Sequence, residues 1–392
     1  MAALHFFLSL GLLLVCAAAG RRVAVRLRQP AVLGELLAGI ALGALHLPML
    51  QAALFDGWLD GLAQLGVLAL LFQTGLESTV PQMLAVGGAA LRVASIGVAV
   101  PFGLGWLVAR SLLPQEPTAL HVFLGATLTA TSVGITARVL RDLGASQSRA
   151  ARVILGAAVI DDVLGLVLLA IVTGAIATGA VQPASVALIA GKALLFLALA
   201  LPLGAWLTPR LLRLAARVHR TFGLLAVGLG LCAGLAWLAA LAGLAAIVGA
   251  FVAGLVFDAQ SGASLSQRLA RPSAFLASIF FVLMGLRIDV TSLFQPGAIP
   301  LALALLAVAI VGKIAAGIGA GKGVDHLTVG LGMIPRGEVG LIFASIGQSL
   351  FVSGAAIINA RTYAAVLLMV VATTLLTPPL LRWRLARVGQ SA

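Results

Sequence analysis

The chain has 392 residues, of which 61% are hydrophobic and only 9% are charged, and its mean hydropathy is +1.15. Soluble domains of this size do not have such a composition, so the sequence predicts a polytopic membrane protein. The formal charge of +13 does not indicate a nucleic-acid-binding protein, because the basic residues are scattered among hydrophobic runs, form no basic domain and have no interleaved aromatic residues.

Hydrophobic runs separated by charged residues, Pro or Gly predict an all-α protein with thirteen membrane helices. The first run is expected to stay as a helix and not to be a cleaved signal peptide, because its basic residues follow the apolar stretch instead of preceding it. The predicted helices lie near residues 3–20, 30–47, 60–77, 88–110, 117–141, 150–175, 184–208, 221–241, 243–258, 272–288, 297–319, 326–350 and 360–382.

The distribution of Lys and Arg indicates how these helices are oriented. Nineteen of the 25 basic residues follow odd-numbered helices, and only Arg110, Arg287 and Arg361 follow even-numbered ones. The remaining three lie inside predicted helices. Because loops rich in Lys and Arg stay in the cytoplasm, we expect the N-terminus outside and the C-terminus in the cytoplasm.

The sixth predicted helix contains two adjacent acids, Asp161 and Asp162, in an otherwise apolar run. Asp161 lies nine residues after Arg152, which corresponds to ~13 Å along a helix and is near the middle of a hydrocarbon core ~30 Å thick. A carboxylate at that depth persists mainly where it faces water, an ion or a basic partner. Since neighbouring helical residues point ~100° apart, one acid can face an ion while the other meets a different partner. This pair is the predicted transport site.

A lysine is expected at the same depth as the aspartates. Lys313 lies nine residues before Lys322, as Asp161 lies nine residues after Arg152. An isolated ammonium at that depth must lose its proton or find an acid. The side chain is too short to reach either membrane surface. We therefore predict an ion pair between Lys313 and one aspartate of the pair.

Two predicted helices are interrupted deep inside by residues that weaken helical structure. Residues 129–136 of the fifth helix carry four hydroxyl side chains beside a glycine, and residues 334–338 of the twelfth contain a proline and a glycine. The two helices are seven apart and so run antiparallel, as inverted repeats require, and paired interruptions mark a transporter binding site. For the fifth helix alone an ordinary kink explains the residues equally well, whereas Arg336 and Glu338 favour a functional break in the twelfth.

The remaining polar residues inside the hydrophobic runs are assigned simpler roles. Arg336 and Glu338 are expected to support the break, by compensating each other and the dipoles of the half-helices, and only then to assist ion access. Glu35, near the start of the second helix, either lines a cytoplasmic funnel or is a solvated acid, and we prefer the second interpretation. Cys16 and Cys232 have no metal-binding or redox spacing, so they are expected to pack in the core.

Four segments of the sequence resemble those of a known family, the bacterial cation:proton antiporter-2 family, and within it the NapA-type sodium/proton antiporters. The segments are 130–138 (ATSVGITAR), 160–162 (IDD), 312–313 (GK) and 335–340 (PRGEVG). The resemblance runs from Gln29 through the last helix. The pair of aspartates together with the buried lysine is a specific combination, whereas a Gly-rich apolar helix alone is not.

The resemblance implies an inverted-repeat, NhaA-like antiporter fold of thirteen helices with two crossed discontinuous helices, a homodimer, and an elevator-like movement of a core domain. By this resemblance, residues 1–87 and 221–296 are the two parts of a dimerisation domain (helices one to three and eight to ten). Residues 88–180 and 297–392 are the two parts of the core ion-transport domain (helices four to six and eleven to thirteen), and residues 181–220 are a linker helix.

The resemblance also assigns roles to individual residues. Asp162 is implied as the principal carrier of cation and proton, Asp161 as the partner of Lys313, and Thr131 and Ser132 as further ligands of the cation. The transported ions are Na⁺ or Li⁺ and H⁺, and no cofactor is expected. The expected location is a bacterial inner membrane, and the expected partners are a second copy of the chain and membrane lipids, including anionic ones at the basic cytoplasmic loops, but not nucleic acid.

The expected function is electrogenic sodium(lithium)/proton exchange, in which cation and protons compete for the aspartate pair. Potassium/proton exchange within the same superfamily is the alternative, and glutathione-gated potassium efflux is disfavoured because no βαβ segment follows Arg382. A bile-acid-type sodium symporter would need a set of polar contacts large enough for an organic substrate. A membrane-embedded enzyme is disfavoured because intramembrane proteases place their aspartates on separate helices. One departure from the family is the polar pair Gln73-Thr74, from which no functional change is inferred.

Overall fold

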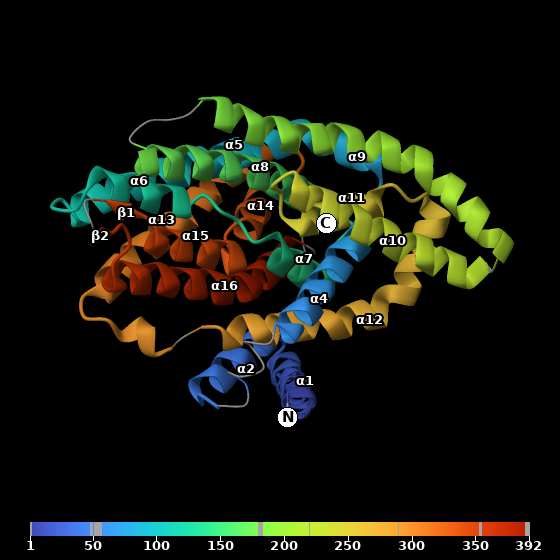
Figure 1. The fold of residues 1–392 in the computed structure, drawn as a ribbon, viewed down its shortest axis with the longest axis horizontal. Coiled ribbons are helices and arrows are strands. Elements are labelled where there is room, and N and C mark those ends of the chain that lie inside the picture. Colours follow the sequence, from blue (N-terminus) through green and yellow to red (C-terminus); the bar gives the residue numbers. More distant parts are fainter. Residues whose placement is uncertain are drawn as a thin grey trace.

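The computed structural model describes residues 2–47, 50, 57–178, 183–218, 220–288, 290–352 and 355–388. Almost all of this part is helical (Figure 1). The α-helices are α1 Ala2–Arg26, α2 Ala31–Ala44, α4 Trp58–Leu76, α5 Val80–Leu112, α6 Thr118–Thr127, α7 Val133–Asp142, α8 Arg149–Thr178, α9 Pro183–Val218, α10 Arg220–Leu241, α11 Ala246–Leu255, α12 Ala259–Leu286, α13 Ala298–Ala316, α14 His326–Gly332, α15 Gly337–Ser349 and α16 Ala360–Val388. The 3₁₀ helices are η1 Thr291–Phe294 and η2 Gly317–Ala320, and two short antiparallel strands are β1 Phe351–Val352 and β2 Ala355–Ala356.

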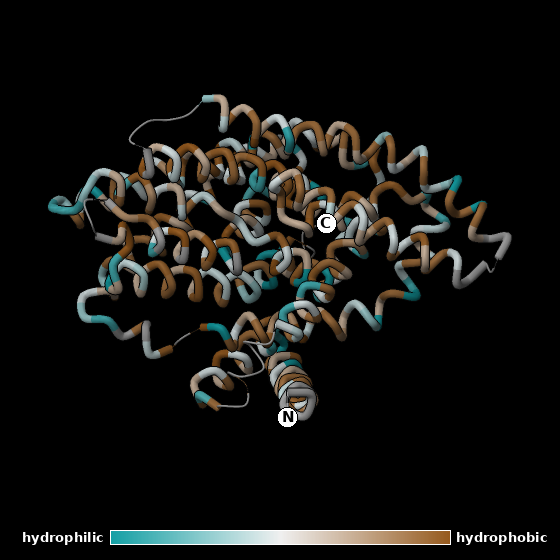
Figure 2. Tube along the Cα trace, in the orientation of Figure 1, coloured by the Kyte–Doolittle hydropathy of each residue, from teal (hydrophilic) through white to brown (hydrophobic). Residues whose placement is uncertain are grey.

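Each of the thirteen predicted segments contains a helix in the structure. Within the described residues, nine helices are long and apolar enough to cross a membrane. The shorter apolar helices are Ala31–Ala44, Thr118–Thr127, Ala246–Leu255 and Val339–Gln348. The prediction of an all-helical membrane protein is confirmed, apart from the strand pair, whereas the number of membrane crossings stays a prediction. Figure 2 shows hydrophobic residues along most of each helix, with hydrophilic ones gathered mainly near helix ends and turns.

Several helices continue beyond the apolar stretches that predicted them. The first helix was expected to end near residue 20 but runs to Arg26, so Arg21 and Arg22 are helical and not in a loop. The last was expected to end near residue 382 but runs to Val388. Arg and Leu are good helix formers, and no proline or glycine interrupts either extension. Hydrophobicity therefore located the membrane segments, while helix propensity set their ends.

The helices pack in two groups (Figure 1). In the first, here called the α4 group, α4 packs against α11 and α12, α2 packs against α1 and α12, and α10 packs against α11. In the second, the α13 group, α5 packs against α6, α8 and α13, and α16 packs against α13, α14 and α15. Helix α9 contacts α8 of one group and α10 of the other, and the short helix α7 contacts α8 and α16 as well as α4 and α2. Helix α7 therefore lies at the boundary between the groups.

Glycines allow α4 and α11 to approach until their backbones touch. A Cβ atom at Gly254 of α11 would overlap the carbonyl oxygen of Phe72 in α4, and a Cβ atom at Gly75 would overlap that of Phe251. Small residues at such contacts let membrane helices pack closely where the hydrophobic effect between them is weak. This contact fixes α11 against α4 beside the candidate site.

Candidate functional site

Helical structure is interrupted at two buried stretches of the chain. Helix α6 ends at Thr127 and α7 begins at Val133, and helix α14 ends at Gly332 and α15 begins at Gly337. The residues between them, 128–132 and 333–336, have no helical assignment. These are the places where the hydroxyl-rich and the Pro-Gly sequences occur. The helix ends therefore leave backbone groups that need other partners.

The two interruptions supply partners for each other. The backbone N–H of Ser132 donates to the carbonyl of Pro335 at 2.7 Å, and the hydroxyl of Thr136 donates to the carbonyl of Gly332 at 2.6 Å. The hydroxyl of Thr131 donates to the carbonyl of Met333 at 3.4 Å. Because each stretch satisfies groups that the other leaves open, neither would be stable at this depth alone.

Arg336 and Gly337, where the second interruption meets α15, both contact the first interruption. Arg336 is fully buried, and its guanidinium donates to the carbonyl of Ala130 in the first interruption. Gly337 has a φ angle of +45°, and a Cβ atom there would overlap the side chain of Ser132. A glycine is therefore required on both conformational and steric grounds. The side chain of Glu338, which was predicted to support the break, lies outside the described part of the structure.

Lys313 connects the first interruption to the aspartates. Its side chain is fully buried on α13, and its Nζ donates to the carbonyl of Thr129 at 2.7 Å. The same Nζ lies 3.5 Å from Oδ1 of Asp161, which is also buried. The ion pair that equal depth predicts is present. The carbonyl of Thr129, which the sequence did not single out, is available because the chain leaves the helix at this point.

The two aspartates have different surroundings. Asp161 lies with Lys313, within hydrogen-bonding reach of the Thr131 hydroxyl, and it attracts Arg336 electrostatically. Asp162 is half-buried and lines a small hollow where α8 meets α4, α7 and α11. The other residues around this hollow are Leu71, Val133, Leu155, Val159, Ile247, Val248 and Phe251. The geometry of adjacent helical residues thus directs one carboxylate to a lysine and the other to a boundary between helix groups.

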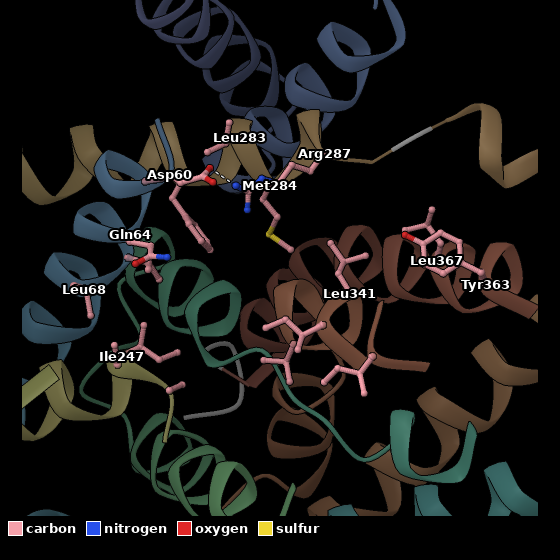
Figure 3. Close-up of a pocket in the computed structure, with 18 residues that line it drawn as sticks. Asp60, Gln64, Leu68, Ile247, Leu283, Met284, Arg287, Leu341, Tyr363 and Leu367 are labelled. Carbon is pink, nitrogen blue, oxygen red and sulfur yellow. Dashed lines mark hydrogen bonds and ion pairs between the residues drawn. The ribbon is translucent and has the colours of Figure 1, made fainter. Parts of the chain in front are cut away.

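A larger cavity of about 650 Å³ separates the two helix groups near the hollow (Figure 3). Residues of α4 and α12 line one side of it, and α15 and α16 contribute Leu341, Tyr363 and Leu367 to the other. Asp60 and Arg287 form an ion pair in its wall. Ile247 lines both this cavity and the hollow beside Asp162. One hydrophobic side chain is therefore shared by the two spaces.

The expectation that Glu35 is a solvated acid is wrong. Glu35 is fully buried in α2, accepts a hydrogen bond from Ser278 of α12 at 2.6 Å and lies 3.4 Å from the guanidinium of Arg138. A buried carboxylate needs a cation or donors, and α7 and α12 provide both. Position in the sequence did not show this, because the partners lie far away along the chain.

The contacts of two arginines near the boundary between the helix groups were not anticipated from the sequence. Arg138 and Arg141 were counted only as charges that orient the helices, yet Arg138 is buried and Arg141 is largely covered. Arg141 donates to the side-chain oxygen of Gln73 at 2.8 Å and to the hydroxyl of Thr74 at 3.1 Å. The signal that pointed to them was the unusual polar pair Gln73-Thr74 in an apolar helix.

Comparison with known proteins identifies the family to which this chain belongs. A family model described as sodium/hydrogen exchanger, transmembrane, matches residues 10–386. The chain belongs to the sodium/hydrogen exchanger family. This exchanger is 34% identical to the high-affinity Na⁺/H⁺ antiporter NhaS3 of Synechocystis, an alignment that covers 96% of this chain and 88% of the relative. It is 32% identical to the Na⁺/H⁺-K⁺ antiporter GerN of Bacillus cereus, over 97% of this chain and 96% of the relative.

Solved structures agree on the fold of this exchanger. The sodium/proton antiporter MjNhaP1 of Methanocaldococcus jannaschii superposes with a TM-score of 0.70 at 17% sequence identity, over 97% of this chain and 96% of that one. The resemblance seen in the sequence motifs is thereby confirmed at the level of the family. This exchanger is a multi-pass membrane protein, a cation/proton antiporter by family, and a secondary transporter and not an enzyme.

Proposed function

We propose that this protein is an electrogenic sodium(lithium)/proton antiporter in which cation and protons compete for Asp162 and Asp161. The observation that carries the proposal is the position of Asp162. It is half-buried in a hollow at the boundary of two helix groups, on the residue next to the Lys313–Asp161 ion pair. A single carboxylate there can meet ions from the neighbouring cavity while remaining shielded from bulk water.

The chemistry of the surrounding groups suits exchange of a small hard cation for protons. Removal from water favours the protonated form of a carboxyl group, whereas a bound cation favours the ionised form, so the two ligands exclude each other. Oxygen ligands from Asp162, Asp161, Thr131 and Ser132 suit Na⁺ or Li⁺. When Asp161 turns to the cation, Lys313 loses its partner and can release a proton. More than one proton then moves per cation, which makes the exchange electrogenic.

Movement of the α13 group against the α4 group would carry the loaded aspartate across the membrane. We assign residues 88–180 and 297–392 to this moving core, residues 1–87 and 221–296 to a dimerisation domain shared with a second copy, and residues 181–220 to the linker. The cavity of about 650 Å³ between the groups supports this assignment, because ions can reach the boundary there. The two interruptions then form the crossed pair of discontinuous helices, within an NhaA-like inverted repeat.

The distribution of basic residues indicates which end of the protein faces outward in a bacterial inner membrane. With the N-terminus outside, the end of α4 that carries Asp60 faces outward, and so does the large cavity. The other end of α4 and the end of α7 with Arg138 and Arg141 face the cytoplasm. The structure then corresponds to a state that is hollow toward the outside and packed toward the cytoplasm.

Reconstituted vesicles test the proposal. Protein in proteoliposomes that hold a pH-sensitive dye should move protons when Na⁺ or Li⁺ is added, and flux should increase when valinomycin and K⁺ clamp the membrane potential. Flux with K⁺ as well as Na⁺ would support the alternative, potassium exchange, and the relative GerN is itself named a Na⁺/H⁺-K⁺ antiporter. Absence of flux with all three cations would contradict the proposal.

A further inference from the structure

The end of the molecule opposite the large cavity is held by two arginines of α7. Arg138 donates to Glu35 of α2 at 3.4 Å and to the carbonyl of Ala274 of α12 at 3.5 Å. Its guanidinium also lies 5.9 Å from the centre of the Phe281 ring on α12. Only 2% of this side chain is exposed, so these contacts hold a charge that has almost no access to water.

Arg141 makes a second set of contacts, with the last two turns of α4 and with Glu77, the residue that follows this helix. It donates to Gln73 at 2.8 Å, to Thr74 at 3.1 Å and to the carbonyl of Leu70 at 3.4 Å. It also lies 3.5 Å from Glu77. A planar guanidinium presents five donors in a fixed fork and can hold several oxygen atoms in one arrangement, whereas a lysine ammonium has three donors on a single freely rotating nitrogen atom.

We propose that Arg138 and Arg141 are positioning residues of transport, which clamp α7 to the α4 group and must release before this end of the protein opens to water. The proposal rests on the proposed function, since it requires α7 to move with the aspartates against α2, α4 and α12. Helix α7 is joined to the second interruption by Ser132 and Thr136, so a displacement of the aspartate region carries α7 with it.

The charged residues of this clamp also have partners on their own side of the contact, which they keep when α7 separates from the α4 group. Arg138 donates to Asp142, one turn further along α7, at 3.1 Å. Glu35 keeps its hydrogen bond from Ser278 at 2.6 Å, and both residues belong to the α4 group. Glu77 likewise accepts a hydrogen bond from Ser266 of α12 at 3.5 Å. After separation, Arg138, Glu35 and Glu77 each keep one of these partners, and Arg141 keeps the electrostatic attraction of Asp142 on its own helix. A contact that opens and closes repeatedly requires such residual partners, because an uncompensated charge away from water is costly.

Cross-linking across the clamp tests the movement. In a background with Cys16→Ala and Cys232→Ala, the pair Gln73→Cys and Arg141→Cys is joined with a short reducible bis-thiosulfonate reagent. Sodium-driven proton flux should fall to the level of empty vesicles and return on reduction. The control pair, Gln73→Cys with Ser266→Cys, joins two helices of the same group, since Gln73 donates to the carbonyl of Ser266 at 3.3 Å. Cross-linking this control pair should leave its flux equal to that of the same variant before the reagent is added.

Flux that persists in the cross-linked Gln73→Cys/Arg141→Cys protein would overturn the clamp. Absence of flux in the cysteine-free parent would instead contradict the proposed function, and a second measurement then decides the clamp without transport. Thr74 is only 2% exposed, so a cysteine introduced there by Thr74→Cys should react slowly with a maleimide while Arg141 is intact. The reaction should be faster in Arg141→Gln, and Arg141→Lys should give an intermediate rate. This measurement uses a background with Cys16→Ala only, in which the buried native Cys232 should react equally in all three variants. Equal rates at position 74 would overturn the proposal.

Discussion

At the scale of single residues, the interrupted backbone helps to hold the buried charge of Lys313. One partner of this lysine is the carbonyl of Thr129 and the other is Asp161. The carbonyl exists as an acceptor only because α6 has ended. Loss of either charge would leave the other in a site that water does not reach. The ion pair is therefore a condition for the interrupted helix as much as a part of the transport site.

Replacement of Lys313 tests this dependence. Lys313→Gln should lower the free energy of unfolding by ~3–5 kcal/mol, the range for removing one partner of a buried ion pair. The double variant Lys313→Gln/Asp161→Asn should recover most of that loss, because no buried charge is then unpaired. Unfolding in detergent, followed by tryptophan fluorescence, measures both. A double variant no more stable than Lys313→Gln would show that the two residues do not interact.

Asp325 gives a residue-scale prediction with a pH dependence. It caps α14 through the N–H of Thr328, and the guanidinium of Arg384 donates to it at 2.8 Å. The hydrogen bond from Arg384, with those from Thr328, holds the pKa of this carboxyl below its usual range. A lowered pKa contributes stability above the unfolded value of ~3.9 and loses it as the pH falls through the folded value.

Asp325→Asn should therefore unfold at a lower temperature than the parent protein at pH 7. The difference should shrink as the pH is lowered below ~4, where the carboxyl of the unfolded parent chain takes up a proton while that of the folded protein still resists it. Thermal unfolding at a series of pH values checks this. A difference of the same size at pH 7 and at the lowest pH would mean that the Arg384–Asp325 pair does not stabilise the fold.

At the scale of elements, close approach of backbones positions the helices around the site. Helix α11 supplies Ile247 to both the cavity and the hollow, and it is held against α4 at Gly254. The interruptions follow the same logic, since Ser132 and Pro335 join α7 to α15 by backbone groups. Because a glycine has no side chain, a Cβ atom added at Gly254 would overlap the backbone of α4 and push the two helices apart.

A pair of glycine substitutions tests the helix contact. Gly254→Ala should destabilise the protein by ~1–3 kcal/mol, the usual cost of overpacking, because the new Cβ atom meets the carbonyl of Phe72. Gly234→Ala on α10 is the control, as its Cβ atom would have no neighbour within 4 Å among the described residues. It should be neutral, or stabilising by up to ~1 kcal/mol. Equal losses in the two variants would show that the close contact is not specific.

At the scale of the whole molecule, the sequence contained most of the fold because membrane segments are signalled locally. A run of apolar residues, a pair of helix-breaking motifs and the depths of Lys313 and Asp161 can each be counted along the chain. The partners of Glu35 could not be found in this way, because Arg138 lies 103 residues away and meets it only through packing. The same holds for the shared position of Ile247. Depth in the membrane is a property of one helix, whereas the boundary between helix groups is a property of several.

The most direct test of the account is sodium-driven proton flux in proteoliposomes that contain Asp162→Asn. This change removes the charge that the hollow presents while keeping the size of the side chain, so the fold and the Lys313–Asp161 pair should persist. The account predicts a folded protein, with the unfolding temperature of the parent, whose flux on adding Na⁺ is no greater than that of empty vesicles. Parent-level flux in this variant would contradict the assignment of Asp162 as the ion carrier.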